Sequence, residues 1–377
     1  MAFLLGATFA SVMTTIGYIL LAIVVLLVMI TIHEFGHYSF GKWLGFKINE
    51  FSIGFGKAIF SKTKKDGEKF SIRLLPLGGY CAFAGEDEED KDPNAFNNKA
   101  PWKRIIVLFG GVLFNFISAI IFAFILLVGF GYDIPKIDSA TDNQAFVQTY
   151  NEKVLEYNQG KPESEHKQLL QPFEDGDIIR QVDGKNVSFV SGNTFPVLMS
   201  SYEINDVFTL TVQRQGESEW VQIHMTKFAD PNDATSTGIL GVMTSPYRYN
   251  FWEALINCVP LAAAMAWQVL VFLFMLLTGG VSISDMGGPL KTIGTIAEFS
   301  QANIANLFVF LPFIAANLAV FNILPIPSLD GSRILFTTIE WIRRKPINRK
   351  VEGYIHFGGL VVLFAFVIFV DIFNLFW

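Results

Sequence analysis

Five consecutive residues, His33-Glu34-Phe35-Gly36-His37, combine two imidazoles and a carboxylate at a spacing that permits metal chemistry. On a helix, His33 and His37 project from one face, one turn apart, where both can bind the same Zn²⁺ ion. Glu34 lies close by and can take the proton from a zinc-bound water. The motif therefore predicts His33 and His37 as metal ligands and Glu34 as the catalytic base.

The segment that carries this motif is apolar. Residues 18–32, directly before it, contain no charged side chain. A lone histidine on an apolar helix face is usually a satisfied core residue. Two histidines and a glutamate are harder to explain in this way, because ionisable groups are costly in hydrocarbon and by default mark function. The combination predicts water-dependent metal chemistry inside a membrane.

The composition also indicates a membrane protein. Hydrophobic residues make up 51% of the chain, 38 residues are Phe, and the mean hydropathy is +0.41, which is too apolar for an ordinary soluble domain. The net charge of −6 argues against nucleic acid as a partner, and the lipid bilayer is the expected surrounding. Uncharged runs that suit membrane helices occur at residues 16–32, 105–130, 257–280, 304–329 and 357–370.

Charge is unevenly distributed among the polar segments. Residues 41–104 contain twelve Lys or Arg and nine Asp or Glu, and residues 341–351 contain five basic and no acidic residues. Residues 133–250 contain nine basic and seventeen acidic residues. By the positive-inside rule, the first two segments are expected in the cytoplasm and the acidic segment outside. The first helix (helix 1, about residues 16–40) then runs inward, and His33 lies about 22 Å beyond Tyr18, in the cytoplasmic half of the bilayer.

A second inward helix must end at the same depth to complete a metal site. A helix at residues 304–327 ends at that depth, just before Asp330, only if the chain crosses the membrane an odd number of times between the outside segment and Asp330. Residues 252–280 must therefore form an interfacial or re-entrant helix instead of a full span. This is expected despite the length of residues 252–280. The four spans are expected at about 16–40, 104–130, 304–327 and 354–372.

The candidate third ligand lies in the segment Asn322-Ile323-Leu324-Pro325-Ile326-Pro327-Ser328-Leu329-Asp330-Gly331. Two prolines two positions apart break a helix, so its freed backbone groups need polar partners or water. Pro-x-Pro followed by Asp-Gly is by itself often only a helix exit and turn. Beside the histidine motif, and on the same side of the membrane, Asp330 is expected at the broken end as a ligand.

The motif at residues 33–37 and the pattern at residues 322–331 together resemble the site-2 proteases, which are intramembrane zinc metalloproteases, and within them the bacterial RseP-type group. The resemblance extends over most of the chain, including residues 95–99 and 287–289. It implies Zn²⁺ as the cofactor, with His33, His37 and Asp330 as its ligands and Glu34 as the catalytic base. It also implies that the protein lies in a bacterial cell (inner) membrane, with the active site towards the cytoplasm. The partners it implies are single-span membrane protein substrates, such as anti-sigma factors and remnant signal peptides.

The second expected helix (helix 2, about residues 104–130) departs from the family pattern, which often has Gly-Pro before an asparagine. This chain has Gly110-Gly111 and then Asn115, so Asn115 is retained as a candidate polar group at the site while the kink of helix 2 can differ. Polar and helix-breaking residues near the metal are expected to contact the substrate. The expected substrate-binding residues are Asn115, Asn317, Asn322, Pro325 and Pro327.

The acidic outside segment contains a pattern similar to the core of a PDZ domain. Residues 174–187 match its Gly-Asp turn, strand and Asp-Gly turn. Apolar and polar side chains alternate in residues 207–225, on both sides of a turn at Gln215-Gly216. One PDZ-like domain at about residues 165–228 is expected, although a generic hairpin would give the same alternation. Residues 142–168 are polar and show no clear pattern.

Between helices 1 and 2, residues 51–56 and 70–75 flank a polar turn and predict a β-hairpin. The family resemblance implies that this segment, at about residues 46–83, is a membrane-associated β-loop beside the active site. An unpaired strand edge there can pair with an unwound substrate.

The expected fold is a polytopic α-helical membrane protein with four transmembrane helices, a membrane-associated β-hairpin loop and an inserted extracytoplasmic PDZ-like α+β domain. It has an N-terminal membrane part (1–132), an extracytoplasmic segment (133–248) and a C-terminal membrane part (249–377). The expected activity is that of a zinc metalloendopeptidase.

Two other classes of protein stay open. A metal transporter could use the same donors as a transit site, but transporters usually show internal repeats, and no matching pair of broken helices is found. A catalytically inactive scaffold could bind partners through the PDZ-like domain, but the intact Glu34 argues against it. His356, near the cytoplasmic start of the last helix, is a candidate fourth ligand, and a histidine at the membrane interface is the simpler interpretation.

Overall fold

The computed structural model of the chain has two compact units, one formed by Met1–Ala123 and Met265–Trp377 and the other by Phe124–Ala264. Helices α2 (Pro101–Gly129) and α5 (Phe251–Thr278) each contribute residues to both units. The structure describes residues 9–86, 90–132, 134–137, 140–169, 173–174, 176–214, 220–227, 244–280 and 287–376.

Within the described part of the chain, five helices are long and apolar enough to cross a membrane. Each of them lies at one of the apolar runs of the sequence, so the prediction of a multi-pass membrane protein is confirmed. Length and composition do not separate α5 from the other four helices, and the count of four spans stays a prediction. The five helices are α1 (Phe9–Trp43), α2, α5, α7 (Ala305–Ile323) and α9 (Arg349–Phe376).

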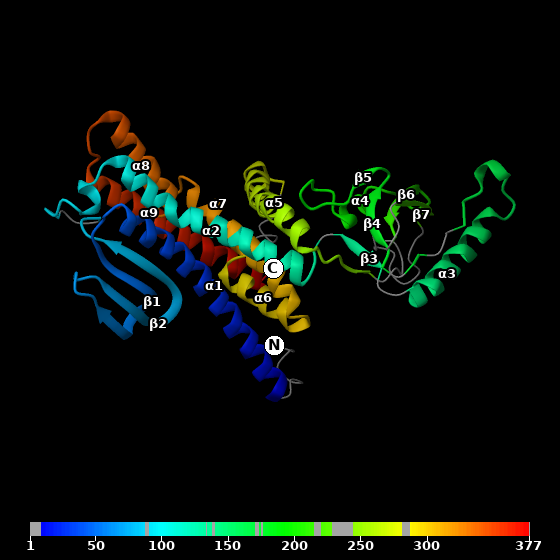
Figure 1. The fold of residues 1–377 in the computed structure, drawn as a ribbon, viewed down its shortest axis with the longest axis horizontal. Helices are drawn as coiled ribbons and strands as arrows, with labels where there is room; N and C mark the ends of the chain where they lie inside the picture. Colours follow the sequence, from blue (N-terminus) through cyan, green and yellow to red (C-terminus); the bar gives the residue numbers. More distant parts are fainter. Residues whose placement is uncertain are drawn as a thin grey trace. The chain divides into compact units, whose positions relative to one another are not determined.

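In the first unit, α1 packs against a β-hairpin and against two other helices, α6 (Pro289–Ala302) and α7 (Figure 1). Helix α6 also contacts α7 and α9. Helix α7 contacts α1 and the short α8 (Asp330–Arg343). Because proline cannot continue a helix, Pro325 and Pro327 separate α7 from α8 by a turn. This turn places the start of α8 beside α1.

Strands β1 (Ile48–Thr63) and β2 (Lys69–Phe83) form an antiparallel hairpin between α1 and α2. Thr63 pairs with Lys69 at the tip of the hairpin. Both segments that the sequence predicts as strands lie within it. Strand β2 packs against α1 (Figure 1), so the backbone of the hairpin reaches the helix that carries the two histidines.

The second unit is an α+β domain with an antiparallel sheet. Its strand order is β7-β6-β4-β3-β8, and β5 also pairs with β4. The expected hairpin in residues 207–225 is formed by β6 and β7, while Asp175 and the turn at Gln215-Gly216 lie outside the described residues. The strands are β3 (Pro135–Ile137), β4 (Ile178–Val182), β5 (Lys185–Asn186), β6 (Val207–Gln213), β7 (Trp220–Thr226) and β8 (Thr244–Pro246).

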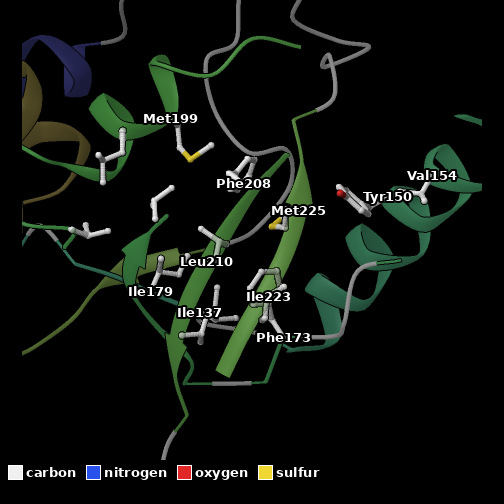
Figure 2. Packing of buried hydrophobic residues seen from close by; sticks show 14 residues of the cluster. Ile137, Tyr150, Val154, Phe173, Ile179, Met199, Phe208, Leu210, Ile223 and Met225 are labelled. Atoms are coloured by element: carbon white, nitrogen blue, oxygen red, sulfur yellow. The ribbon is translucent and has the colours of Figure 1, made fainter. Parts of the chain in front are cut away.

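The core of this unit lies between the sheet and two helices, α3 (Ala140–Asn158) and α4 (Phe195–Ser200) (Figure 2). The sequence showed no clear pattern where α3 forms. The helix packs through Val147, Tyr150 and Val154, which share one face of a segment that is mainly polar. Three apolar residues give too weak a period to predict a helix, and packing against the sheet stabilises it.

Candidate metal centre

His33 and His37 lie one turn apart on α1, and both side chains are buried. Their Nε2 atoms are 3.2 Å apart, and their rings meet edge to face with centroids 4.7 Å apart. Residues four positions apart lie on the same face of a helix, so the local geometry of α1 is sufficient to bring the two imidazoles together.

Asp330 reaches the histidines from a distant part of the chain. It is the first residue of α8 and follows the turn that contains the two prolines. Its Oδ2 atom lies 3.0 Å from Nε2 of His33 and 3.2 Å from Nε2 of His37. Among the residues that the structure describes, these three form the one group of His, Cys, Asp or Glu side chains close enough to share a metal ion.

The donor set fits zinc. The Nδ1 atom of His37 donates to the backbone oxygen of Val107 at 2.9 Å, so Nε2 keeps its lone pair for a metal. The Oδ2 atom of Asp330 is buried without a hydrogen-bond partner, which favours a cation beside it. Two imidazoles and one carboxylate are ligands that zinc accepts, with a fourth position left for water or substrate.

Asn115 lies behind His33, on the side away from the other donors. It is fully buried on α2, and its Nδ2 atom lies 3.1 Å from Nδ1 of His33, while its Oδ1 atom has no partner. A half-turn of the amide exchanges these two atoms, so that Oδ1 accepts the Nδ1–H of His33 and Nε2 is left for a metal. The structure thus brings Asn115 to a histidine ring, and its contact with substrate stays a prediction.

Glu34 is oriented by the hairpin. Its Oε2 atom accepts a hydrogen bond from the backbone N–H of Cys81 on β2 at 3.0 Å. A Cβ added at Gly79 would lie 3.7 Å from Cγ of Glu34, so the strand also packs closely against this side chain. Burial, together with the negative charge of Glu34, raises the pKa of the Cys81 thiol, which therefore stays protonated and is a poor metal ligand.

Glycines let α2 approach α1. A Cβ at Gly36 would lie 2.3 Å from the carbonyl oxygen of Gly110, and a Cβ at Gly111 would lie 2.5 Å from Nε2 of His37. Larger residues at these positions would push the helices apart or enter the metal site. In the sequence, Gly110-Gly111 stands out only as a departure from the family pattern. Small residues that face each other between apolar helices are a signal of close packing that could have found this role.

The remaining predicted site residues lie at the end of α7. Asn317 and Asn322 are half-buried on α7, Pro325 is exposed and Pro327 is half-buried in the turn that follows. The turn joins these residues directly to Asp330. Their contact with substrate stays a prediction.

The chain matches the model of peptidase family M50 over residues 21–366. A Fusobacterium nucleatum protein named "Putative zinc metalloprotease FN1322" is 28% identical over 368 residues, covering 94% of this chain and 97% of the relative. A Nostoc protein named "Putative zinc metalloprotease all3971" is 30% identical over 379 residues, covering 93% of this chain and 94% of the relative. "Zinc metalloprotease RasP" of Oceanobacillus iheyensis is 27% identical over 427 residues, covering 91% and 95%.

The matched region extends over nearly the whole chain. It contains the helix that carries His33 and His37 and the turn that carries Asp330. The relationship to the RseP-type group, predicted from the two motifs, is confirmed by these matches. The chain belongs to peptidase family M50, the site-2 proteases, and is a zinc metallopeptidase.

Proposed function

We propose that this protein is an intramembrane protease that hydrolyses peptide bonds within or next to the transmembrane segments of single-span membrane proteins. In this proposal His33, His37 and Asp330 bind Zn²⁺ and Glu34 is the catalytic base. The observation that carries it is the position of Asp330 Oδ2, 3.0 and 3.2 Å from the Nε2 atoms of the two histidines. These donors lie on or beside helices that suit a bilayer, so the scissile bond must come from a membrane segment or its edge.

The surrounding residues have separate roles in the reaction. Bound at the three donors, zinc would supply Lewis-acid chemistry, lowering the pKa of the attacking water and polarising the scissile carbonyl. Glu34 accepts the proton of that water and returns it to the departing amine. The N–H of Cys81 holds the Glu34 carboxylate in place. The carbonyl of Val107 and the amide of Asn115 hold the two histidine rings.

The hairpin is proposed to bind the substrate as an added strand. A helical substrate shields its carbonyls in hydrogen bonds, so cleavage requires local unwinding. An edge of the hairpin can replace those hydrogen bonds for an extended chain. Large apolar side chains are exposed on the hairpin, which supports its association with lipid. They include Phe55, Ile59, Phe60, Leu74 and Leu75.

The end of α7 is proposed as the other side of the substrate path. Pro325 and Pro327 free backbone groups of the preceding helix, and such groups are tolerated at membrane depth only where protein, water or substrate satisfies them. Asn317 and Asn322 lie on the same helix and are proposed to hold the extended chain or the oxyanion.

Four of the five apolar helices are proposed to span the membrane, with α5 interfacial or re-entrant. The backbone nitrogen of Leu290, in α6, lies 3.3 Å from Oδ2 of Asp371, near the end of α9. Helix α9 begins beside the basic residues 343–350, which the positive-inside rule assigns to the cytoplasm, so its end lies outside. The start of α6 then also lies outside, and the chain from Phe251 to Leu290 makes no net crossing. Helix α7 consequently runs inward like α1, as the meeting of the three donors requires.

The α+β unit is proposed as a single PDZ-like domain on the extracytoplasmic side of a bacterial inner membrane. The basic residues in 41–104 and 341–351, which the positive-inside rule assigns to the cytoplasm, support this side, because α2 then leads outward. The domain would exclude substrates with bulky outside domains or read newly formed C-termini. Anti-sigma factors that another protease has already shortened outside, and remnant signal peptides, are the proposed substrates, because neither then carries a bulky outside domain.

The test is the cleavage of a reporter that carries one type II transmembrane segment and no bulky outside domain. Purified wild type and Glu34→Gln are compared, and wild type is also assayed with a zinc chelator. We expect cleavage by wild type alone, lost with the chelator and restored by added zinc. Glu34→Gln should retain zinc, because the substitution leaves all three ligands in place.

Two results would contradict the proposal. Loss of zinc from Glu34→Gln would mean that Glu34 is a ligand and not the base. Absence of cleavage by wild type across several reporters, with one equivalent of zinc bound, would favour a scaffold or a transporter.

A further inference from the structure

We propose that His356 on α9 is a positioning residue, which holds the turn before Asp330 so that the Asp330 carboxylate faces the two histidines. The inference rests on the proposed role of Asp330 as a zinc ligand. Among the described residues, the donor group contains His33, His37 and Asp330 and does not include His356. His356 therefore acts through the backbone of the turn.

Within the turn at residues 324–329, two backbone hydrogen bonds form, from Ile326 N–H to Leu324 O at 2.7 Å and from Leu329 N–H to Ile326 O at 3.1 Å, and neither involves Ser328. Pro325 and Pro327 have no N–H to donate. Ser328 has a φ of +80°, in the left-handed region that residues other than glycine rarely adopt. The residue before α8 is Leu329, which makes no side-chain cap, and the carboxylate of Asp330 is turned towards the histidines. The unfavourable backbone conformation at Ser328 therefore needs support from neighbouring elements.

His356 makes two hydrogen bonds to Ser328 from outside the turn. The backbone N–H of Ser328 donates to Nδ1 of His356 at 3.1 Å, and the Ser328 hydroxyl donates to the backbone oxygen of His356 at 2.7 Å. Because Nδ1 accepts a hydrogen bond, the proton of the neutral ring is on Nε2. The two bonds fix the backbone and side chain of a residue two positions before Asp330.

Close packing supports the same contact. A Cβ added at Gly359, one turn further along α9, would lie 2.2 Å from Cβ of Pro327. The His356 ring also meets Phe336 of α8 edge to face, with centroids 5.6 Å apart. The His356 side chain is only 15% exposed, because it packs against the turn and α8. Packing against α9 thus fixes the position of the turn, and the turn fixes the position of Asp330.

Asparagine and glutamine separate the role of the ring acceptor from that of side-chain volume. The Oδ1 atom of asparagine can take the place of Nδ1 and accept the N–H of Ser328. Glutamine carries its amide further out, at the level of Nε2, and leaves that N–H without an acceptor. The two substitutions keep a polar side chain and differ in where the acceptor lies.

The experiment measures zinc affinity by competition with a chromogenic chelator, on the purified full chain, for His356→Asn, His356→Gln and His356→Ala. We expect His356→Asn to stay within about threefold of wild type, and the other two to bind zinc about 10- to 100-fold more weakly, as for other residues that orient metal ligands. Tyr354→Leu is the control, because Tyr354 lies on the same helix and is 76% exposed. It should bind zinc like wild type.

The outcomes separate this inference from the proposed function. Wild-type zinc affinity in His356→Gln and His356→Ala would overturn the inference. An equal loss in His356→Asn and His356→Gln would also overturn it, because the acceptor at Nδ1 would then not matter. If Asp330→Ala bound zinc as tightly as wild type, the assignment of Asp330, and with it the proposed function, would fail independently of His356.

Discussion

The Oε2 atom of Glu34 on α1 accepts a hydrogen bond from the backbone N–H of Cys81 on β2, at 3.0 Å. This bond joins the helix that carries the two histidines to the hairpin that is proposed to bind substrate. A hydrogen bond to a charged group is stronger than one between neutral groups, so it gives the carboxylate a defined orientation. The hairpin therefore positions the proposed catalytic base as well as the proposed substrate.

Removal of this N–H by Cys81→Pro should slow hydrolysis about 10- to 100-fold, because a hydrogen bond to a charged group contributes about 1.5–3 kcal/mol. Zinc content should not change, since Cys81 is not among the three donors. Reporter cleavage and metal analysis on the same preparation measure both. Cys81→Ala, which keeps the N–H and removes only the thiol, should cleave at the wild-type rate. An equal loss in both variants would show that the side chain, not the N–H, matters.

Gly111→Ala should abolish tight zinc binding. The added Cβ would lie 2.5 Å from Nε2 of His37, and His37 is held from behind by its hydrogen bond to Val107, so the ring cannot easily move away. Gly129→Ala is the matched control on α2, because a Cβ there meets nothing within 4 Å. This control should keep zinc and unfold at the same or a higher temperature, since alanine favours a helix over glycine. Full zinc occupancy in Gly111→Ala would contradict the packing described here.

Zinc should stabilise the fold through the three proposed ligands. Ligand that binds only the folded state adds about 2.7 kcal/mol at one hundred times its Kd. Adding zinc to the stripped protein should therefore raise the unfolding temperature of wild type and of Glu34→Gln by the same amount. Asp330→Ala should show little or no increase. Thermal unfolding in detergent micelles measures the unfolding temperature of the three proteins with and without zinc. An increase in Asp330→Ala equal to that of wild type would show that Asp330 is not a ligand.

The stability contributed by Glu68 should be lost in acid. Burial of Glu68 favours its neutral form, but hydrogen bonds from Lys42, Lys64 and Tyr38 outweigh burial and hold the pKa of this carboxyl below its ordinary value of 4.5. A pKa lowered by folding means that the stabilisation is complete above the unfolded-state pKa and disappears as the pH falls through the folded-state pKa. The difference in unfolding temperature between wild type and Glu68→Gln should be largest at neutral pH and should shrink in acid, as the pH falls progressively below 4.5. A difference that does not shrink there would assign the effect to packing instead.

The position of the two histidines could be predicted from the sequence because it depends on local geometry alone. Four residues of helix bring His33 and His37 to one face, whatever surrounds them. The long helices were also predictable, since a bilayer requires long apolar runs. Asp330 required one further argument, that a helix broken by two prolines ends on the side where the first helix carries its histidines. The structure brings these three residues together.

The groups that hold the proposed ligands and base were decided only by the tertiary structure. The N–H of Cys81, the carbonyl of Val107 and the amide of Asn115 contact residues 47, 70 and 82 positions away in the chain. Two of these groups belong to the backbone, which every residue has, so no residue type marks them in the sequence. Helix α3 forms for a similar reason, because its few apolar residues gain a partner only when the sheet is in place. The sequence by itself determined which side chains can do the chemistry, whereas the packing of helices and hairpin determined what orients them, since such contacts depend on distances that local spacing does not encode.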